Sequence, residues 1–448
     1  MPAGGEYFKG GTLRNNPSPM KEVYNTRMRR KAQIWDCIEA FGKNYNNHHM
    51  YCIIDLEAHI NEALLEKAIK KSLPVFPILK SSYKTGIYRA YWSDSGRYDR
   101  DFRLMISEEN EEEAINSFLK DEIRETSDIQ LKAKIVRKKE KDKILIAINH
   151  MVCDASDFKR YLYVLSGIYT KLLDNGSYIP KEVYDGSRSS IGVYLSFMKG
   201  LKTGKEKLNA LFRMQNHASY PLAVKFLDQS IVKPFIVSHS IDKERFLNLK
   251  QYGKQQGVTI NDIFLASFLR TIRNHLSDPW EEINIPCMVD LRRFLKEDFH
   301  SIKNLTSTLV VGMEHDMGKD CHETVQKVHR KVAELLDHFP ALDGYLYLIL
   351  LFKLLPISVV QAFIDRYFKS FPIAFSNLGI IDSKQLKFGE LVVENCRMTG
   401  SIKQKPCFWL AMSSFDDKVT LTINLEGSRE DQSFAERFLQ ELEGELPA

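Results

Sequence analysis

Residues 144–154 read Ile-Leu-Ile-Ala-Ile-Asn-His-Met-Val-Cys-Asp, and this stretch organises the fold around one histidine. The unbroken apolar run 144–148 predicts a central strand that is buried on both faces. His150 comes just past the end of that strand, and a helix is predicted over residues 156–173. The strand should hold the backbone in place while the following turn presents the imidazole ring.

A histidine presented in this way suits proton abstraction, because imidazole accepts a proton near neutral pH. Asp154, four residues later, is expected to pair with a cation and lock the turn without touching the ring. The alternative is structural: His150 hydrogen-bonds within the core, and Asp154 caps the next helix. The spacing alone leaves both interpretations open.

The rest of the chain alternates strands with helices in both halves. In the first half, residues 49–56 predict a strand, and Asn61 caps a helix over 61–72 that Pro74 and Pro77 stop. Strands are predicted at 129–135, 144–148, 235–241, 283–290, 305–313, 373–381, 391–398, 407–415 and 419–426. Further helices are predicted from about residue 243, after Thr259, and over 430–442.

These patterns predict an α/β (or α+β) protein of two lobes. A chain of 448 residues also exceeds what one hydrophobic core usually supports. The expected division is an N-terminal lobe over 1–185, an irregular linker over 186–230 and a C-terminal lobe over 231–448.

Composition excludes several other classes of protein. The net charge of +5 is a weak basic excess, and no zinc-finger spacing or recognition helix points to nucleic acid. The seven cysteines are scattered without a CxxC pair, which fits a reducing, cytoplasmic setting. No secretion signal is apparent at the N-terminus. We expect a monomer. We also expect no metal site, because neither His48-His49 nor His315 with His322 has a well-spaced third ligand.

One segment, residues 344–364, is strongly apolar but is interrupted by Lys353, Pro356 and Gln361. A membrane-spanning helix needs about 20 apolar residues with few charges. We therefore expect a helix that breaks before Pro356 and packs on the core or contacts a membrane peripherally.

Four motifs resemble those of the chloramphenicol-acetyltransferase-like superfamily, which includes condensation domains, wax ester synthases and alcohol acetyltransferases. Residues 149–154 look like its HxxxD motif, and residues 257–266 are similar to its "GVTxNDxxLA" helix start. Residues 286–293 resemble its "PVDLR" strand, and 376–379 look like the "SNLG" segment of the alcohol acetyltransferase branch. The motifs fall in the family's order and span most of the chain.

The resemblance implies two chloramphenicol-acetyltransferase-like subdomains with a tunnel between them and His150 at its middle. It implies an acyl thioester as the donor, either acyl-CoA or an acyl group on the phosphopantetheinyl arm of an acyl-carrier protein. The implied acceptor is an alcohol or an amine. No cofactor would be permanently bound. Asp154 would form a structural salt bridge with Arg292, with Arg293 as the second choice.

The chemistry fits this assignment. A thioester is already activated, so the enzyme must align two substrates, remove one proton and stabilise a tetrahedral oxyanion. We expect Ser376 or Asn377 to lie near that oxyanion; the alternative is that both belong only to a turn at a strand end.

Three departures from the family pattern matter. Asn149 stands where condensation domains usually have a first histidine, which favours an ester-forming branch. Ala155 replaces a usual glycine, so a positive φ there would distort the site. The DFGWG motif of the plant branch is absent.

Three other functions stay open. The protein could be a condensation-type transferase fed by a carrier protein in trans, or a catalytically silent binding module of the same fold. Cys153, inside the motif, could instead act as a nucleophile with His150, although no activating partner is evident.

Overall fold

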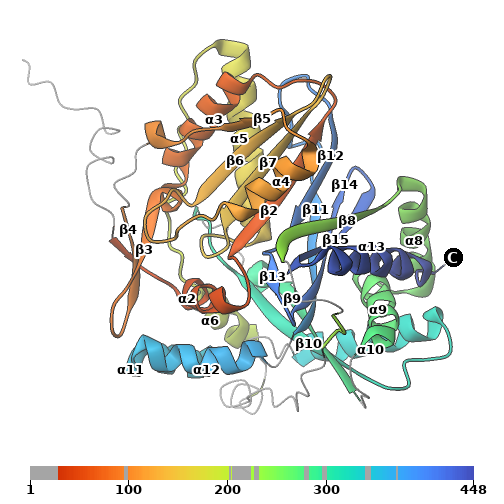
Figure 1. Ribbon diagram of the computed structural model, residues 1–448. Helices are drawn as coiled ribbons and strands as arrows, with labels where there is room; N and C mark the ends of the chain where they lie inside the picture. The colour runs from red at the N-terminus through yellow and green to blue at the C-terminus, as the bar shows by residue number, and fades with distance from the viewer. Residues whose placement is uncertain are drawn as a thin grey trace, which may run out of the picture.

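A five-stranded sheet forms the first lobe, in the order β12-β2-β7-β6-β5 (Figure 1). Its strands are β2 (His49–Leu56), β5 (Met105–Ser107), β6 (Leu131–Arg137), β7 (Asp142–Asn149) and β12 (Val393–Thr399). All eight residues of β7 are buried, as the apolar run predicts. Ile144, Ile146 and Ile148 pack into the larger core, whereas Leu145 and Ala147 pack into a smaller core on the other face.

Helices cover both faces of this sheet, which explains why β7 has no polar face. The helices α3 (Glu62–Val75) and α5 (Ala155–Asn175) contribute to the larger core, and α4 (Glu111–Lys120) to the smaller one. The predicted end of the first helix was wrong: Pro74 lies inside the last turn of α3, which continues to Val75.

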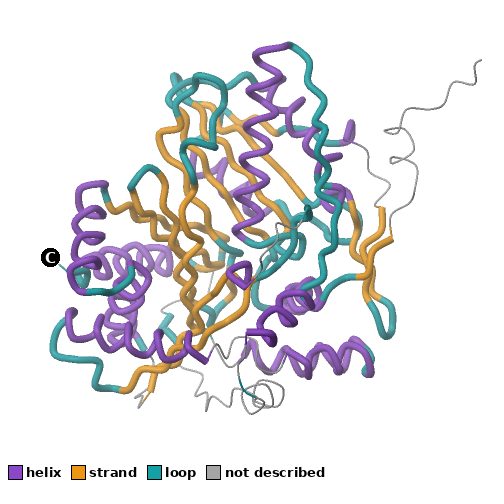
Figure 2. Tube along the Cα trace, turned by 180° about the vertical axis from the view of Figure 1, so that it is seen from behind, coloured by secondary structure: helices purple, strands orange, loops and turns teal. Residues whose placement is uncertain are grey.

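The sheet of the second lobe has the order β10-β9-β11-β14-β15-β13, and β8 pairs with β15. Its strands are β8 (Lys233–Ile241), β9 (Glu282–Asp290), β10 (Thr306–Glu314), β11 (Ile373–Ile381), β13 (Lys403–Gln404), β14 (Phe408–Phe415) and β15 (Lys418–Gly427). Its helices are α8 (Lys243–Gln256), α9 (Ile260–Ile272), α10 (Cys321–His338) and α13 (Arg429–Gly444). Seen from behind, the strands of the two lobes lie next to each other with helices around them (Figure 2).

A small third sheet, β1-β4-β3, lies at the side of the first lobe. Its strands are β1 (Arg29–Lys31), β3 (Ser81–Thr85) and β4 (Ala90–Asp94). Nearby, α2 (Ile34–Phe41) contacts both α11 (Tyr345–Leu354) and α12 (Ile357–Lys369). Because α11 ends at Leu354 and α12 begins at Ile357, the predicted break before Pro356 is confirmed.

One strand crosses the boundary drawn from the sequence. β12 belongs to the C-terminal part of the chain, yet it pairs antiparallel with β2, from Val393 opposite Leu56 to Thr399 opposite Tyr51. The two lobes are thus joined by a shared sheet as well as by connecting loops.

The computed structural model describes residues 29–94, 99–200, 203, 223–226, 232–276, 282–294, 300–338, 345–369 and 372–447. Within the predicted linker, the described residues include helix α6 (Ile191–Gly200); most of the remainder lies outside them. No helix in the described part is both long enough and apolar enough to cross a bilayer.

Candidate functional site

His150 lies directly after β7, and both its backbone N–H and its backbone carbonyl are hydrogen-bonded. Its N–H donates to the carbonyl of His48 at 2.6 Å, and its carbonyl accepts from Nδ2 of Asn304 at 2.7 Å. The side chain is 22% exposed. The ring atom Nδ1 is buried and makes no hydrogen bond with the described residues, and Oε1 of Glu39 lies 4.0 Å from it. The backbone is fixed while the ring stays available.

Asp154 combines the two roles that the sequence left as alternatives. Its Oδ1 accepts from the N–H of Asp157 and so caps α5. Its Oδ2 receives Nη1 of Arg292 at 2.8 Å and the N–H of Leu305 at 2.7 Å. Burial raises the pKa of Asp154, but the charge and hydrogen bonds of Arg292 outweigh burial and bring the pKa below its ordinary value.

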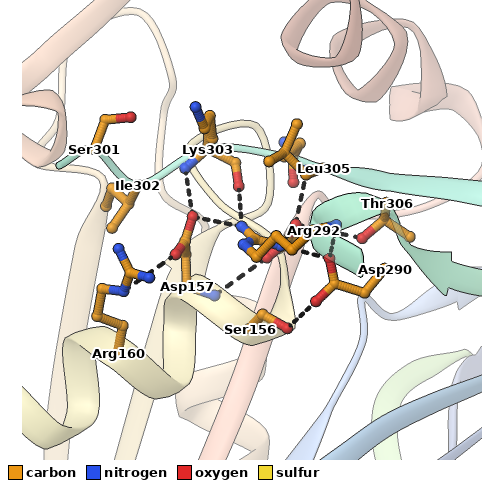
Figure 3. Close-up of polar contacts among 12 residues, drawn as sticks. Ser156, Asp157, Arg160, Asp290, Arg292, Ser301, Ile302, Lys303, Leu305 and Thr306 are labelled. Atoms are coloured by element: carbon orange, nitrogen blue, oxygen red, sulfur yellow. Dashed lines mark hydrogen bonds and ion pairs between the residues drawn. The ribbon is translucent and has the colours of Figure 1, made fainter. Parts of the chain in front are cut away.

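Arg292 binds three carboxylates rather than one. Besides Asp154, its Nη2 lies 2.6 Å from Oδ2 of Asp157, and its Nη1 lies 3.0 Å from Oδ1 of Asp290 (Figure 3). Nη2 also donates to the carbonyl of Lys303 at 3.2 Å. Burial and the neighbouring Asp154 raise the pKa of Asp157 despite Arg292. The arginine comes from the turn Leu291–Phe294 after β9, so this cluster fastens the second lobe to the HxxxD turn.

The sequence did not indicate Asp157, whose position in the first turn of a helix is ordinary for an acidic residue. It also did not indicate a second buried ion pair, between Arg188 and Asp36 at 2.8 Å. Nη1 of Arg188 donates to the carbonyl of Val152 at 2.6 Å. Arg188 falls in the predicted linker, where no local pattern shows that its side chain reaches the core.

His48 is an unusual neighbour of His150. Its φ of +57° places a non-glycine residue in the left-handed region, which costs energy and is often found at functional sites. Burial, followed by the charges of Lys43 and His150, lowers the pKa of His48 to about 3. His48 is therefore neutral at physiological pH.

The predicted oxyanion residues lie on β11, at a bulge between Asn377 and Gly379. The Asn377 side chain accepts from the N–H of Gly379 at 2.9 Å and lies 3.4 Å from Oδ1 of Asn261. Nζ of Lys159, on α5, donates to the carbonyl of Leu378 at 2.9 Å. The bulge therefore lies beside the helix that follows the motif. No hydrogen bond links Ser376 or Asn377 to His150 within the described residues, and their role stays a prediction.

Two concerns raised by the motif are answered by the structure. Ala155 is the first residue of α5 and is not among the residues with positive φ, so its Cβ causes no distortion. Cys153 is fully buried, and burial raises the pKa of its thiol well above the ordinary value, which disfavours a nucleophilic thiolate. Among the described residues, no group of three or more His, Cys, Asp or Glu side chains is arranged to hold a metal ion.

Comparisons with known proteins give one family match and many similar folds. The WS/DGAT C-terminal domain model matches residues 303–445. Polyketide synthase associated protein 5 from Mycobacterium tuberculosis is similar in structure, with a TM-score of 0.65, 12% identity, and coverage of 93% of this chain and 96% of that chain. No curated protein sequence gives a significant match.

Two further structures show the same likeness. Trichothecene 15-O-acetyltransferase TRI3 from Fusarium sporotrichioides has a TM-score of 0.65 and 13% identity, covering 93% of this chain and 94% of that chain. The first condensation domain of the CDA synthetase has a TM-score of 0.65 and 13% identity, covering 94% and 98%. The chain therefore has the two-lobe fold of these acyltransferase and condensation domains, and its residues 303–445 match the WS/DGAT C-terminal domain model.

Proposed function

We propose that the protein transfers an acyl group from a thioester donor to an alcohol, with His150 as general base. The observation that carries the proposal is the contrast between His150 and Asp154. Asp154 is fully used by Arg292, Leu305 and the cap of α5, whereas the His150 ring makes no hydrogen bond with the described residues and is 22% exposed on a backbone held from both sides. A residue that is rigidly placed but chemically unengaged is what general-base catalysis needs.

The proposed reaction is a direct transfer of the acyl group from the thiol to the hydroxyl. The imidazole removes the proton of the acceptor hydroxyl while the hydroxyl oxygen attacks the thioester carbonyl carbon. The tetrahedral intermediate then collapses, the C–S bond breaks, and the imidazolium returns the proton to the leaving thiolate. The free thiol and the ester are the products, and no covalent acyl-enzyme forms.

The surroundings of Asn149 support an ester-forming reaction over a condensation-type one. Its Nδ2 donates to Oε1 of Gln130 at 2.8 Å, and its Oδ1 accepts from the N–H of Met151 at 3.0 Å. Both ends of the amide are occupied, so this position offers no second base for an amine acceptor. Acyl-CoA and a carrier-bound thioester remain alternative donors, and a silent binding module is the third candidate.

We also propose that α11 and α12 contact a membrane surface peripherally, which would bring lipid acceptors near. Figure 1 shows the two helices as an outer layer beyond α2. Val360 and Ile364 pack inward, whereas Leu354 is 70% and Phe363 58% exposed. Ile87, at the neighbouring hairpin tip, is 75% exposed and accepts the N–H of Ile357. Exposed apolar side chains of this kind suit a peripheral interface.

The test of the acyl-transfer proposal is thioester turnover. Purified protein is given acyl-CoAs and carrier-bound acyl groups with a panel of alcohols and amines, and release of free thiol is followed. The His150→Ala variant is compared with His322→Ala, whose ring contacts only Tyr252 among the described hydrogen-bond partners. We expect acceptor-dependent thiol release that His150→Ala loses and His322→Ala retains. Background rates in all three proteins with every donor would favour the silent module.

A further inference from the structure

Helix α2 is tied to the turn that carries His150. Asp36 in its first turn accepts Nη2 of Arg188 at 2.8 Å. The same guanidinium donates to the carbonyls of Met151 at 3.2 Å and Val152 at 2.6 Å. Arg188 and Asp36 are both nearly inaccessible, with side chains 4% and 2% exposed. One buried arginine therefore fixes α2 relative to the two residues that follow the histidine.

Glu39 lies three residues after Asp36, near the same face of α2. Its Oε1 is 4.0 Å from Nδ1 of His150, and that nitrogen is buried without a hydrogen bond to the described residues. The Glu39 side chain is 30% exposed, so it has room to change its torsions. Catalytic hydrogen bonds are often long before substrate binds, so a separation of 4.0 Å in the free protein is compatible with a hydrogen bond during the reaction.

We propose that Glu39 is the positioning residue of His150: its carboxylate accepts the Nδ1–H hydrogen bond and leaves Nε2 as the atom that takes the acceptor's proton. A neutral imidazole has one N–H and one free acceptor nitrogen, so a carboxylate on one side fixes which nitrogen is the base. The same carboxylate stabilises the imidazolium that forms during the reaction. The inference rests on the proposed function for its catalytic meaning, but the hydrogen bond itself can be tested separately.

Among the described residues, the carboxylate of the motif itself is not available for this role. Asp154, the acidic residue of the motif, is held by Arg292 and by the N–H of Leu305. No sequence pattern points to Glu39 as a partner of the His150 ring, because Glu39 is distant in sequence and lies on a short helix that was not predicted.

The other titratable groups near Glu39 and His150 are His48, Lys403 and Lys43. His48 has a pKa lowered to about 3, first by burial, and so stays neutral above that pH. Burial lowers the pKa of Lys403, whose charge acts on Glu39, to about 8. Lys43 acts on His48 but pairs with Glu125 at 3.3 Å. Neither His48 nor Lys403 therefore changes its charge substantially between pH 5 and 7.

The kinetic test compares wild type with Glu39→Gln, Glu39→Asp and the control Glu394→Gln, whose carboxylate pairs with Lys141 on the surface. Removing the negative charge disfavours protonated imidazole, so Glu39→Gln should move the acidic limb of kcat/KM about one unit to lower pH. It should also lower kcat roughly ten- to a hundredfold with little change in KM. Glu39→Asp should keep the position of the limb, and Glu394→Gln should match wild type.

A second measurement does not depend on turnover. ¹⁵N-histidine NMR, with the His150 signals assigned by their loss in His150→Ala, reports the titration of that ring directly. Its midpoint should fall in Glu39→Gln and not in Glu394→Gln. An unchanged midpoint together with an unchanged acidic limb would overturn the proposal. If wild type shows no turnover but the midpoint still moves, the acyl-transfer function fails while the Glu39–His150 pair stands.

Discussion

Arg292 is the residue on which the site most depends for its stability, because two buried carboxylates share it. In Arg292→Met, Asp154 and Asp157 lose their cation, and Asp157 already has a raised pKa. Breaking a buried pair on one side costs about 3–5 kcal/mol. We expect the free energy of unfolding in urea to fall by about that amount. Arg160→Met serves as the control, since its contact with Asp157 is longer at 3.6 Å; an equal loss in both variants would contradict the central role of Arg292.

Buried neutral histidines should make the protein sensitive to acid. Burial lowers the pKa of both His48 and His49 to about 3, whereas an unfolded histidine titrates near 6.5. The unfolded state therefore binds more protons between about pH 6.5 and 3, and stability is lost as pH falls through this window. His48→Asn keeps a residue that tolerates positive φ and removes one titrating ring. Its unfolding free energy should decline less steeply than that of wild type between pH 6.5 and 4.5, as measured by chemical denaturation at each pH.

At the residue scale, sequence reasoning predicted the contacts that a motif names and missed those that depend on the fold. The pair Asp154–Arg292 was expected from the resemblance, and the structure brings these residues together at 2.8 Å. Asp36, Glu39 and Arg188 carry no motif. Their roles depend on tertiary contacts of α2 and the segment after α5 with the turn at His150. No local sequence pattern predicts these contacts.

Helix α5 offers a matched test of backbone conformation at the element scale. Gly167 lies inside the helix, and Gly176 follows its end with a φ of +67°; a Cβ at either would meet no atom within 4 Å. An added methyl group therefore makes no close contact at either position, and the two sites differ only in backbone conformation. Gly167→Ala should raise the free energy of unfolding by up to about 1 kcal/mol, and Gly176→Ala should lower it by about 1 kcal/mol. Thermal melts of both variants that shifted in the same direction would contradict this account.

At the element scale, strongly patterned elements were predictable and short ones were not. β2 and β11 have the predicted bounds, and β7, α5 and α13 differ from them by only a few residues. β5 and β13 have three and two residues, too few to show a period. Pro74 is predicted to stop the helix, but a proline in the last turn of α3 is accepted because the packed core on both sides of it outweighs the lost hydrogen bond.

At the scale of the whole molecule, the apolar surface of α11 and α12 predicts binding to lipid vesicles. Replacing Leu354 and Phe363 together by serine removes two large exposed side chains and should lower the vesicle-bound fraction at least tenfold at equal lipid. Leu173 and Leu247 are 49% and 44% exposed on other helices, and their double replacement by serine is the control. Equal sedimentation of both double variants with phospholipid vesicles would rule out a specific role for α11 and α12.

The overall two-lobed architecture followed from the alternation of strands and helices, and the structure confirms it. The division into lobes did not show that β12 returns to the first sheet. β12 was expected as a strand, but the choice of partner is a long-range event that the local pattern does not contain. The predicted tunnel, the linker and the identity of the substrates stay predictions, because each depends on side chains or ligands beyond the pattern of elements.

The pairing of β12 with β2 also has a consequence for biosynthesis. A ribosome releases β2 long before β12, so the edge of β2 that β12 covers has no partner during that interval. An open strand edge of this length is a template for pairing with other nascent chains. Chaperones that hold the emerging first lobe should therefore raise the soluble yield, and a chain that terminates before residue 393 should aggregate even though α3, α4 and α5 are present.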